Sequence, residues 1–161
     1  MAHAHPMSRL GGWEGYVVRD DWMERRDGQS CCVIQLEPLR GISRRCSGCG
    51  ESCSAIHDLE ERRIRDLPVF EHRVELIVPR VRVACPQCGP RLERLSWLEP
   101  YARVTQRLAE SVGRLCQVMA IRHVARFFGL DWKTVKRIDR VRLERTLGPI
   151  DLDGIEVIAL D

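Results

Sequence analysis

Residues 46–89, CSGCGESCSAIHDLEERRIRDLPVFEHRVELIVPRVRVACPQCG, begin and end with the same five-residue unit of the form C-x-x-C-G. Two residues between the cysteines allow both thiolates to face one metal ion, and the glycine permits a backbone that turns amide N–H groups toward the sulfurs. Two such turns complete a closed tetrahedral four-sulfur site, for which Zn²⁺ is the expected metal and iron the less favoured one. The stretch therefore predicts a zinc ribbon with a long insert and a structural Zn²⁺. Its ligands are Cys46, Cys49, Cys85 and Cys88.

Other uses of the cysteines are less consistent with this pattern. A redox site would be a single C-x-x-C in a βαβ context, and two disulfides would require an oxidising compartment. Cys53 and His57 could form a local site with the first cysteine pair, although the repeated glycine favours the paired units. The remaining cysteines are expected as small core residues, and they are Cys31, Cys32 and Cys116.

Short apolar runs around the first cysteine pair predict a β-rich zinc-binding domain over residues 13–100. From Trp13 to Leu39 the chain alternates apolar and charged stretches, with Asp27-Gly28 at the turn of a β-hairpin. Residues 74–78 and 81–83 are two further strand candidates, and Pro79 between them indicates a sheet edge or a turn. Residues 1–12 are predicted to be a disordered lead.

After Pro100 the hydrophobic period changes from two residues to about 3.6, which predicts three helices in a domain over residues 101–148. Thr105 is a suitable N-cap for the first helix, and the other two are expected over residues 121–128 and 132–147. Between them, Gly129 suits a turn with positive φ, and Asp131 is placed to cap the last helix. The predicted fold class is α+β: a zinc-ribbon-like module followed by a helix-turn-helix.

Positive charge is concentrated in the helical segment. Residues 103–145 contain 11 basic and 4 acidic side chains, a net charge of +7, although the whole chain has a net charge of only +3. A solvated helical surface can have the same composition, but a cationic segment that coincides with a helix-turn-helix pattern favours duplex DNA as the partner.

In a helix-turn-helix the second helix enters the major groove with its N-terminus first. Here that helix begins at Trp132, which is equally compatible with a core position and with DNA contact. Side chains that avoid its apolar face are candidate DNA ligands: Lys133, Thr134 and Arg137 for base edges, together with Lys136 and Arg140. Arg140, and Arg126 on the preceding helix, are the candidates for phosphate contact.

The composition excludes several classes of protein. No apolar run reaches the roughly 20 residues that a membrane-spanning helix needs. The first ten residues lack the apolar segment of a secretion signal. We therefore expect a cytoplasmic protein with no membrane contact and no small-molecule substrate.

The ordered set of motifs resembles the insertion-sequence transposases of the ISL-three type. Beside the two cysteine pairs, the resemblance rests on Arg65-Asp66-Leu67-Pro68, the run from Val124 to Lys136, and the ending Asp153-Gly154-Ile155. It implies a bacterial, nucleoid-associated protein whose helix-turn-helix recognises the terminal inverted repeats of an insertion sequence.

The resemblance also implies an RNase H-like catalytic domain, of which residues 149–161 would supply only the first strand. Asp161 would then be the first of three carboxylates that hold two divalent ions, usually Mg²⁺, in a full-length enzyme. One carboxylate cannot organise two ions, so a chain of these 161 residues is expected not to cut DNA by itself.

Two alternatives stay open at this point. The same zinc module and helix-turn-helix would suit a stand-alone transcription regulator. The zinc module could also mediate protein association, while only the helices contact DNA; the oligomeric state is not determined by the sequence, and a homo-oligomer is compatible with it.

Overall fold

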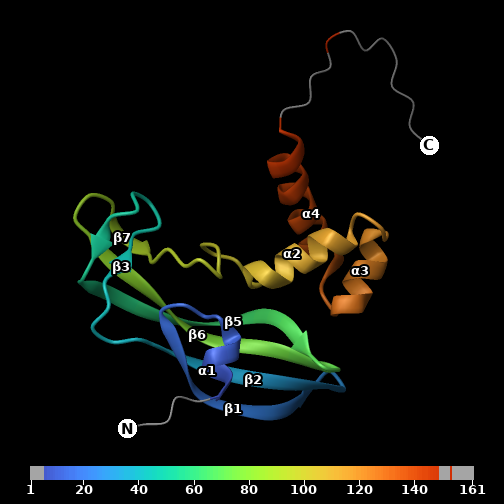
Figure 1. Cartoon of the computed structure of the whole chain (residues 1–161), viewed down its shortest axis with the longest axis horizontal. Coiled ribbons are helices and arrows are strands. Elements are labelled where there is room, and N and C mark those ends of the chain that lie inside the picture. Colours follow the sequence, from blue (N-terminus) through green and yellow to red (C-terminus); the bar gives the residue numbers. More distant parts are fainter. Residues whose placement is uncertain (1–5, 149–152, 154–161) are drawn as a thin grey trace. The chain divides into compact units, whose positions relative to one another are not determined.

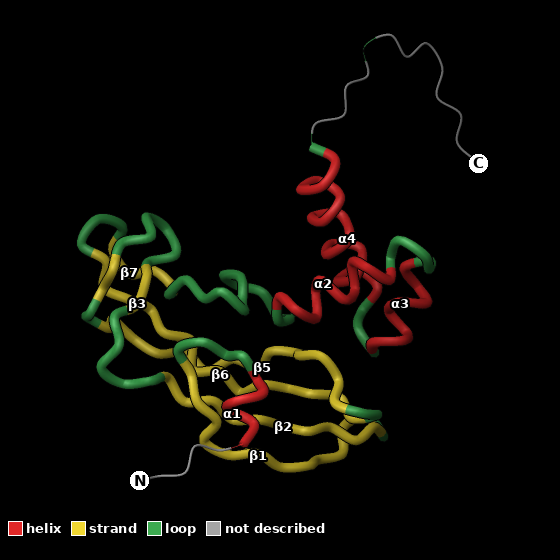
Figure 2. The backbone as a smooth tube through the Cα atoms, viewed as in Figure 1, coloured by secondary structure: helices red, strands yellow, loops and turns green. Residues whose placement is uncertain are grey.

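The computed structural model describes residues 6–148 and residue 153, and it divides the chain into two compact units, Met1–Glu110 and Ser111–Asp161. Every described strand belongs to the first unit, whereas the described part of the second unit is helical (Figure 2). The boundary lies within helix α2 (Gln106–Leu115), somewhat later than the domain boundary that the sequence suggested after residue 100. The predicted α+β class is confirmed.

The first unit is built on one large sheet. Its strands are β1 (Tyr16–Arg26), β2 (Gln29–Pro38), β5 (Ile56–Val69), β6 (His72–Cys85) and β7 (Gly89–Leu92). Figure 1 shows the four longest side by side in the order β1-β2-β6-β5, while β7 extends the sheet by pairing with the end of β6. β2 and β6 run parallel, and all other neighbours are antiparallel.

The predicted hairpin at the start of the sheet is confirmed. β1 and β2 are joined by Asp27 and Gly28, whose φ angles of 52° and 76° are those of a two-residue turn with left-handed backbone. Such a turn matches the right-handed twist of the two strands, which explains why the Asp-Gly pair predicted it.

The turn that was one of two expectations for Pro79 is absent, because β6 continues through it. The other expectation, a sheet edge, fits: opposite β5, pairing of β6 with β2 ends at Ile77 and pairing with β7 starts at Arg82. The Pro79 carbonyl accepts a hydrogen bond from the Tyr16 hydroxyl at 3.0 Å. The backbone polar groups of Pro79 therefore point away from β5, toward the side where parallel pairing with β2 has already ended at Ile77. The absent N–H consequently removes no hydrogen bond from the sheet.

Two further segments differ from the prediction. Pro6–Gly11 form helix α1, within the lead that we expected to be disordered; the backbone N–H of Val18 donates to Ser8 Oγ at 2.9 Å, and Met7 packs against the core. Strand β5 begins at Ile56, in a stretch for which no strand was predicted.

The main core lies on one face of the sheet. It contains Trp13, Tyr16 and Trp97, together with the apolar side chains of β2 and β6, and the Tyr16 and Trp97 rings meet edge to face at 5.6 Å. A buried carboxylate, Asp66, closes this core. It accepts hydrogen bonds from Trp13 Nε1 at 3.1 Å and from the hydroxyl of Thr105, the predicted N-cap of α2, at 2.6 Å.

A second, two-stranded sheet consists of β3 (Arg44–Arg45) and β4 (Ser52–Cys53). An antiparallel bridge between Cys46 and Glu93 connects this small sheet to the chain that follows β7. The first cysteine pair is thereby placed beside the end of β6 and the turn to β7, where the second pair lies.

The second unit contains α3 (Ile121–Phe128) and α4 (Trp132–Leu147), as the hydrophobic period predicted. Val124, Phe128 and Val135 are buried between them. Residues 155–161, the predicted last strand, and Asp161 lie outside the described residues. None of the described helices is long and apolar enough to cross a membrane.

Candidate metal centre and nucleic-acid interface

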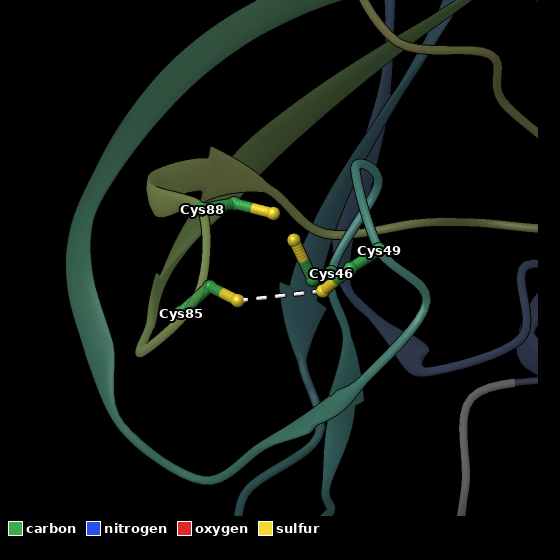
Figure 3. Close-up of side chains that lie close together, drawn as sticks. All are labelled: Cys46, Cys49, Cys85 and Cys88. Atoms are coloured by element: carbon green, nitrogen blue, oxygen red, sulfur yellow. Dashed lines mark hydrogen bonds between the residues drawn. The ribbon is translucent and has the colours of Figure 1, made fainter.

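The two C-x-x-C-G units meet in space. Figure 3 shows the sulfur atoms of the four cysteines directed toward one another. Cys46 and Cys49 come from the loop after β3, Cys85 from the end of β6 and Cys88 from the turn that follows it. The four Sγ atoms all lie within 4.8 Å of one another, and the Sγ atoms of Cys49 and Cys85 are 3.5 Å apart. A tetrahedral zinc ion with Zn–S bonds of about 2.3 Å places its sulfurs about 3.8 Å apart. The donor set therefore fits Zn²⁺.

The backbone of each unit has the conformation that the sequence predicted. Gly50 and Gly89, which follow the second cysteine of each unit, have φ angles of 79° and 68°. Residues with a side chain rarely adopt this left-handed region, so glycine permits the open turn. Within the first C-x-x-C-G sequence, the N–H of Gly48 donates to Cys46 Sγ at 3.4 Å.

Backbone N–H groups also stabilise the thiolate of Cys85. Hydrogen bonds from the N–H of Cys88, and then of Gln87, lower the pKa of Cys85 to about 6 against the opposing effect of burial. At Cys49 the N–H of Glu51 acts in the same direction, but burial and the neighbouring thiols outweigh it and raise the pKa to about 12. A divalent ion bound here would compensate the charge of four thiolates.

The local alternative with Cys53 and His57 does not match the structure. His57 lies exposed on β5, where its Nδ1 is 3.0 Å from Asp58 Oδ2. Cys53 is buried against Cys46 and Cys85 as a core residue, and its Sγ donates to the carbonyl of Glu51 at 3.7 Å. Among the described residues, the paired units alone bring His, Cys, Asp or Glu side chains together as a metal site.

The helix-turn-helix is formed by α3, α4 and a tight turn between them. Gly129 has a φ of 58°, and hydrogen bonds from its N–H to Arg126 O and from Leu130 N–H to Ala125 O close the end of α3. The Asp131 side chain then accepts from the N–H of Lys133 at 2.9 Å and caps α4. Both expectations for this turn are confirmed.

The predicted DNA ligands lie largely on the solvent side of this unit. Lys133, Lys136, Arg137 and Arg140 follow one another at helical spacing along one exposed face of α4. Thr134 is half-buried, and Arg126 is exposed on α3. Arg140 forms an ion pair with Glu144 at 3.5 Å, so that it must exchange this partner to meet a phosphate.

The position of Trp132 is settled in favour of the surface, since its side chain is 51% exposed. The ammonium group of Lys133 lies 6.0 Å from the centre of its indole ring. An exposed aromatic residue at the N-terminus of α4, with cations beside it, adds a flat apolar surface to the candidate DNA-binding face.

Comparison with known proteins finds both modules in one family. Residues 43–88 match the model of the zinc-finger of transposase IS204/IS1001/IS1096/IS1165, and residues 93–140 match the model of the helix-turn-helix domain of transposase family ISL3. These two ranges contain all four cysteines of the candidate metal site and all the candidate DNA ligands.

Similar curated proteins agree with these matches. The chain is 47% identical over 157 residues to the transposase for insertion sequence element IS1001 from Bordetella parapertussis; the match covers 96% of this chain and 38% of that protein. It is 28% identical over 156 residues to the transposase for insertion sequence element IS1557 from Mycobacterium tuberculosis, covering 86% of this chain and 35% of that protein. The chain thus spans well under half the length of these relatives. No solved structure matches significantly.

Proposed function

Because this chain belongs to the ISL3 family of insertion-sequence transposases, we propose that it is the DNA-binding region of such an enzyme, and that it recognises the terminal inverted repeats of an insertion sequence. The observation that carries this proposal is the exposed cationic face of α4, held on a capped helix-turn-helix. Its N-terminal half would enter the major groove, where Lys133, Thr134 and Arg137 would contact base edges. Arg126 and Arg140 would contact phosphates.

The proposed role of zinc is structural. The four cysteines form a closed donor set, which leaves no coordination position for a substrate. Metal binding would instead hold the loop after β3 against the turn after β6. This small region has few apolar contacts that could keep the two segments together without the metal.

Catalysis is proposed only for a longer form of the protein. The resemblance to longer transposases supports a full-length form that uses Mg²⁺, in which Asp161 would be one carboxylate; this stays a prediction. The alternative of a transcription regulator has the same DNA-binding parts, but the 47% identity to a transposase over nearly the whole chain favours the first reading.

The test is a binding selection from a library of random duplexes, repeated at two salt concentrations with the zinc-loaded chain. We expect enrichment of one sequence and a steep fall of affinity with salt, because phosphate contacts release counterions. If no sequence is enriched and affinity does not depend on salt, the proposal is wrong.

A further inference from the structure

The small sheet beside the metal site has two faces of opposite character. On its inner face the side chains are 6% exposed or less, and these residues are Arg44, Cys46, Cys53 and Glu93. Residues that alternate with them along the strands point the other way. We call this side the outer ribbon face; its residues are all exposed, and they are Ser43, Arg45, Ser52 and Arg94.

Two arginines lie directly opposite each other on the outer ribbon face. The bridge between Cys46 and Glu93 sets the register, and the N–H of Arg94 donates to the carbonyl of Arg45 at 2.7 Å. Two like charges in such a pair destabilise an antiparallel sheet. We therefore expect an anionic partner to compensate the two positive charges.

Among the described residues, no acidic side chain compensates the pair. In the described part of the chain, neither Arg45 nor Arg94 lies within 4.0 Å of a carboxylate oxygen, and the guanidinium of Arg45 donates to the carbonyl of Gly50 at 3.5 Å. Glu93, which is adjacent in sequence, points to the inner face. There it binds Arg44 at 2.5 Å and the Tyr16 hydroxyl.

Hydroxyl groups complete the donor set of this face. Ser52 is the cross-strand partner of Arg45 on the other side, and its hydroxyl is hydrogen-bonded to that of Ser43. The outer ribbon face thus presents guanidinium and hydroxyl donors in one row, without an acidic side chain between them. Arginine and serine are ordinary donors to phosphate oxygens of DNA.

We propose that the outer ribbon face binds the phosphate backbone of duplex DNA, as a second contact surface in addition to α4. The inference rests on the proposed function, since the duplex is the same ligand. Phosphate contacts do not depend on base sequence, so this face adds affinity and salt dependence and leaves the choice of sequence to α4.

The test compares R45A/R94A with R25A/R40A in the zinc-loaded full chain. Both double variants remove two positive charges, and Arg25 and Arg40 are also exposed but lie outside this face. Affinity is measured between 50 and 200 mM salt, on the duplex that wild type selects and on a scrambled duplex of equal length. We expect R45A/R94A to reduce the slope of log K against log salt by about 1 to 2 on both duplexes, because each lost phosphate contact removes about 0.9. Equal slopes for the two double variants would overturn the proposal.

A second variant separates binding from folding. R94E turns the like-charge pair into an opposite-charge pair, so that the melting temperature should stay equal or rise while affinity for both duplexes falls at least as far as in R45A/R94A. If affinity falls only in variants that have lost bound metal, the face is structural and the proposal is wrong. Failure of the proposed function is a different result: wild type would then bind the two duplexes equally well.

Discussion

The guanidinium of Arg107 binds the buried carboxylate of Asp66, 41 residues earlier in the chain, with Nε donating to Oδ1 at 2.7 Å. Asp66 is fully buried, whereas the Arg107 side chain is 40% exposed. The same carboxylate accepts from Trp13, from Thr105 and from the N–H of Leu67. It therefore joins the start of the chain, strand β5 and the beginning of α2 at one point.

Asp66→Ala should destabilise the first unit strongly. The substitution leaves the donors of Trp13, Thr105 and Arg107 without their acceptor, and removing one partner from such a buried network costs about 3 kcal/mol or more. Thermal unfolding followed by tryptophan fluorescence measures the change. Arg107→Ala is the matched comparison, because Asp66 then keeps three hydrogen bonds; an equal or larger loss for Arg107→Ala would contradict this account.

Removal of the metal should unfold the region around β3, β4 and β7. The purified chain is expected to contain one zinc per molecule, and a chelator should release it together with part of the strand signal in circular dichroism. Cys85→Ser should prevent stoichiometric zinc binding.

Cys53→Ala serves as the control for that experiment. Cys53 is as buried as Cys85 and packs in the same cluster, but it stands outside the four-sulfur group. Its variant should retain one zinc. A loss of zinc in Cys53→Ala but not in Cys85→Ser would show that the ligand set is wrong.

Arg137→Ala should weaken binding to the selected duplex by about 1 to 3 kcal/mol, which is roughly 5- to 150-fold, with a smaller effect on a scrambled duplex. Arg137 is exposed in the N-terminal half of α4. Arg145 lies in the last turn of the same helix, and Arg145→Ala should change affinity only slightly. Equal effects of the two substitutions would argue against base contact by Arg137. Fluorescence anisotropy with both duplexes gives the comparison.

Asp131→Ala should lower the stability of the helix-turn-helix by about 1 kcal/mol, because α4 loses its N-cap hydrogen bond. Asp131→Ser keeps a cap and should retain most of that stability. Since Asp131→Ser also removes a negative charge beside the candidate DNA-binding face, it should bind duplex DNA as tightly as wild type or more tightly. A drop in affinity for Asp131→Ser would mean that the carboxylate itself has a positioning role.

Features that depend on local chemistry were predictable from the sequence. The turn at Asp27-Gly28 requires a left-handed backbone, the cap at Asp131 requires a short side-chain acceptor, and the C-x-x-C-G units require cysteine and glycine. In each case the residues that cause the structure are neighbours in the chain, so that a short pattern identifies it.

Features that depend on distant partners were missed. Strand β5 begins in a charged stretch with little apolar alternation, and it forms a strand because β6 offers a long partner. Pro79 is tolerated because the pairing of β2 with β6 ends before it, and Asp66 gains its role from residues up to 53 positions away. The outer ribbon face could have been suspected from the alternation of Ser43 and Arg45 with Arg44 and Cys46, but the opposition of Arg45 to Arg94 could not.

The metal site draws its two cysteine pairs from either side of the β5–β6 hairpin. During synthesis the first pair leaves the ribosome well before the second, so that a nascent chain offers only half of the ligands until both long strands have been made. Because chains fold from the N-terminus as they emerge, zinc can be captured only after the hairpin is complete. Zinc binding would then follow the pairing of β5 with β6, and it would be completed just before the DNA-binding helices are synthesised.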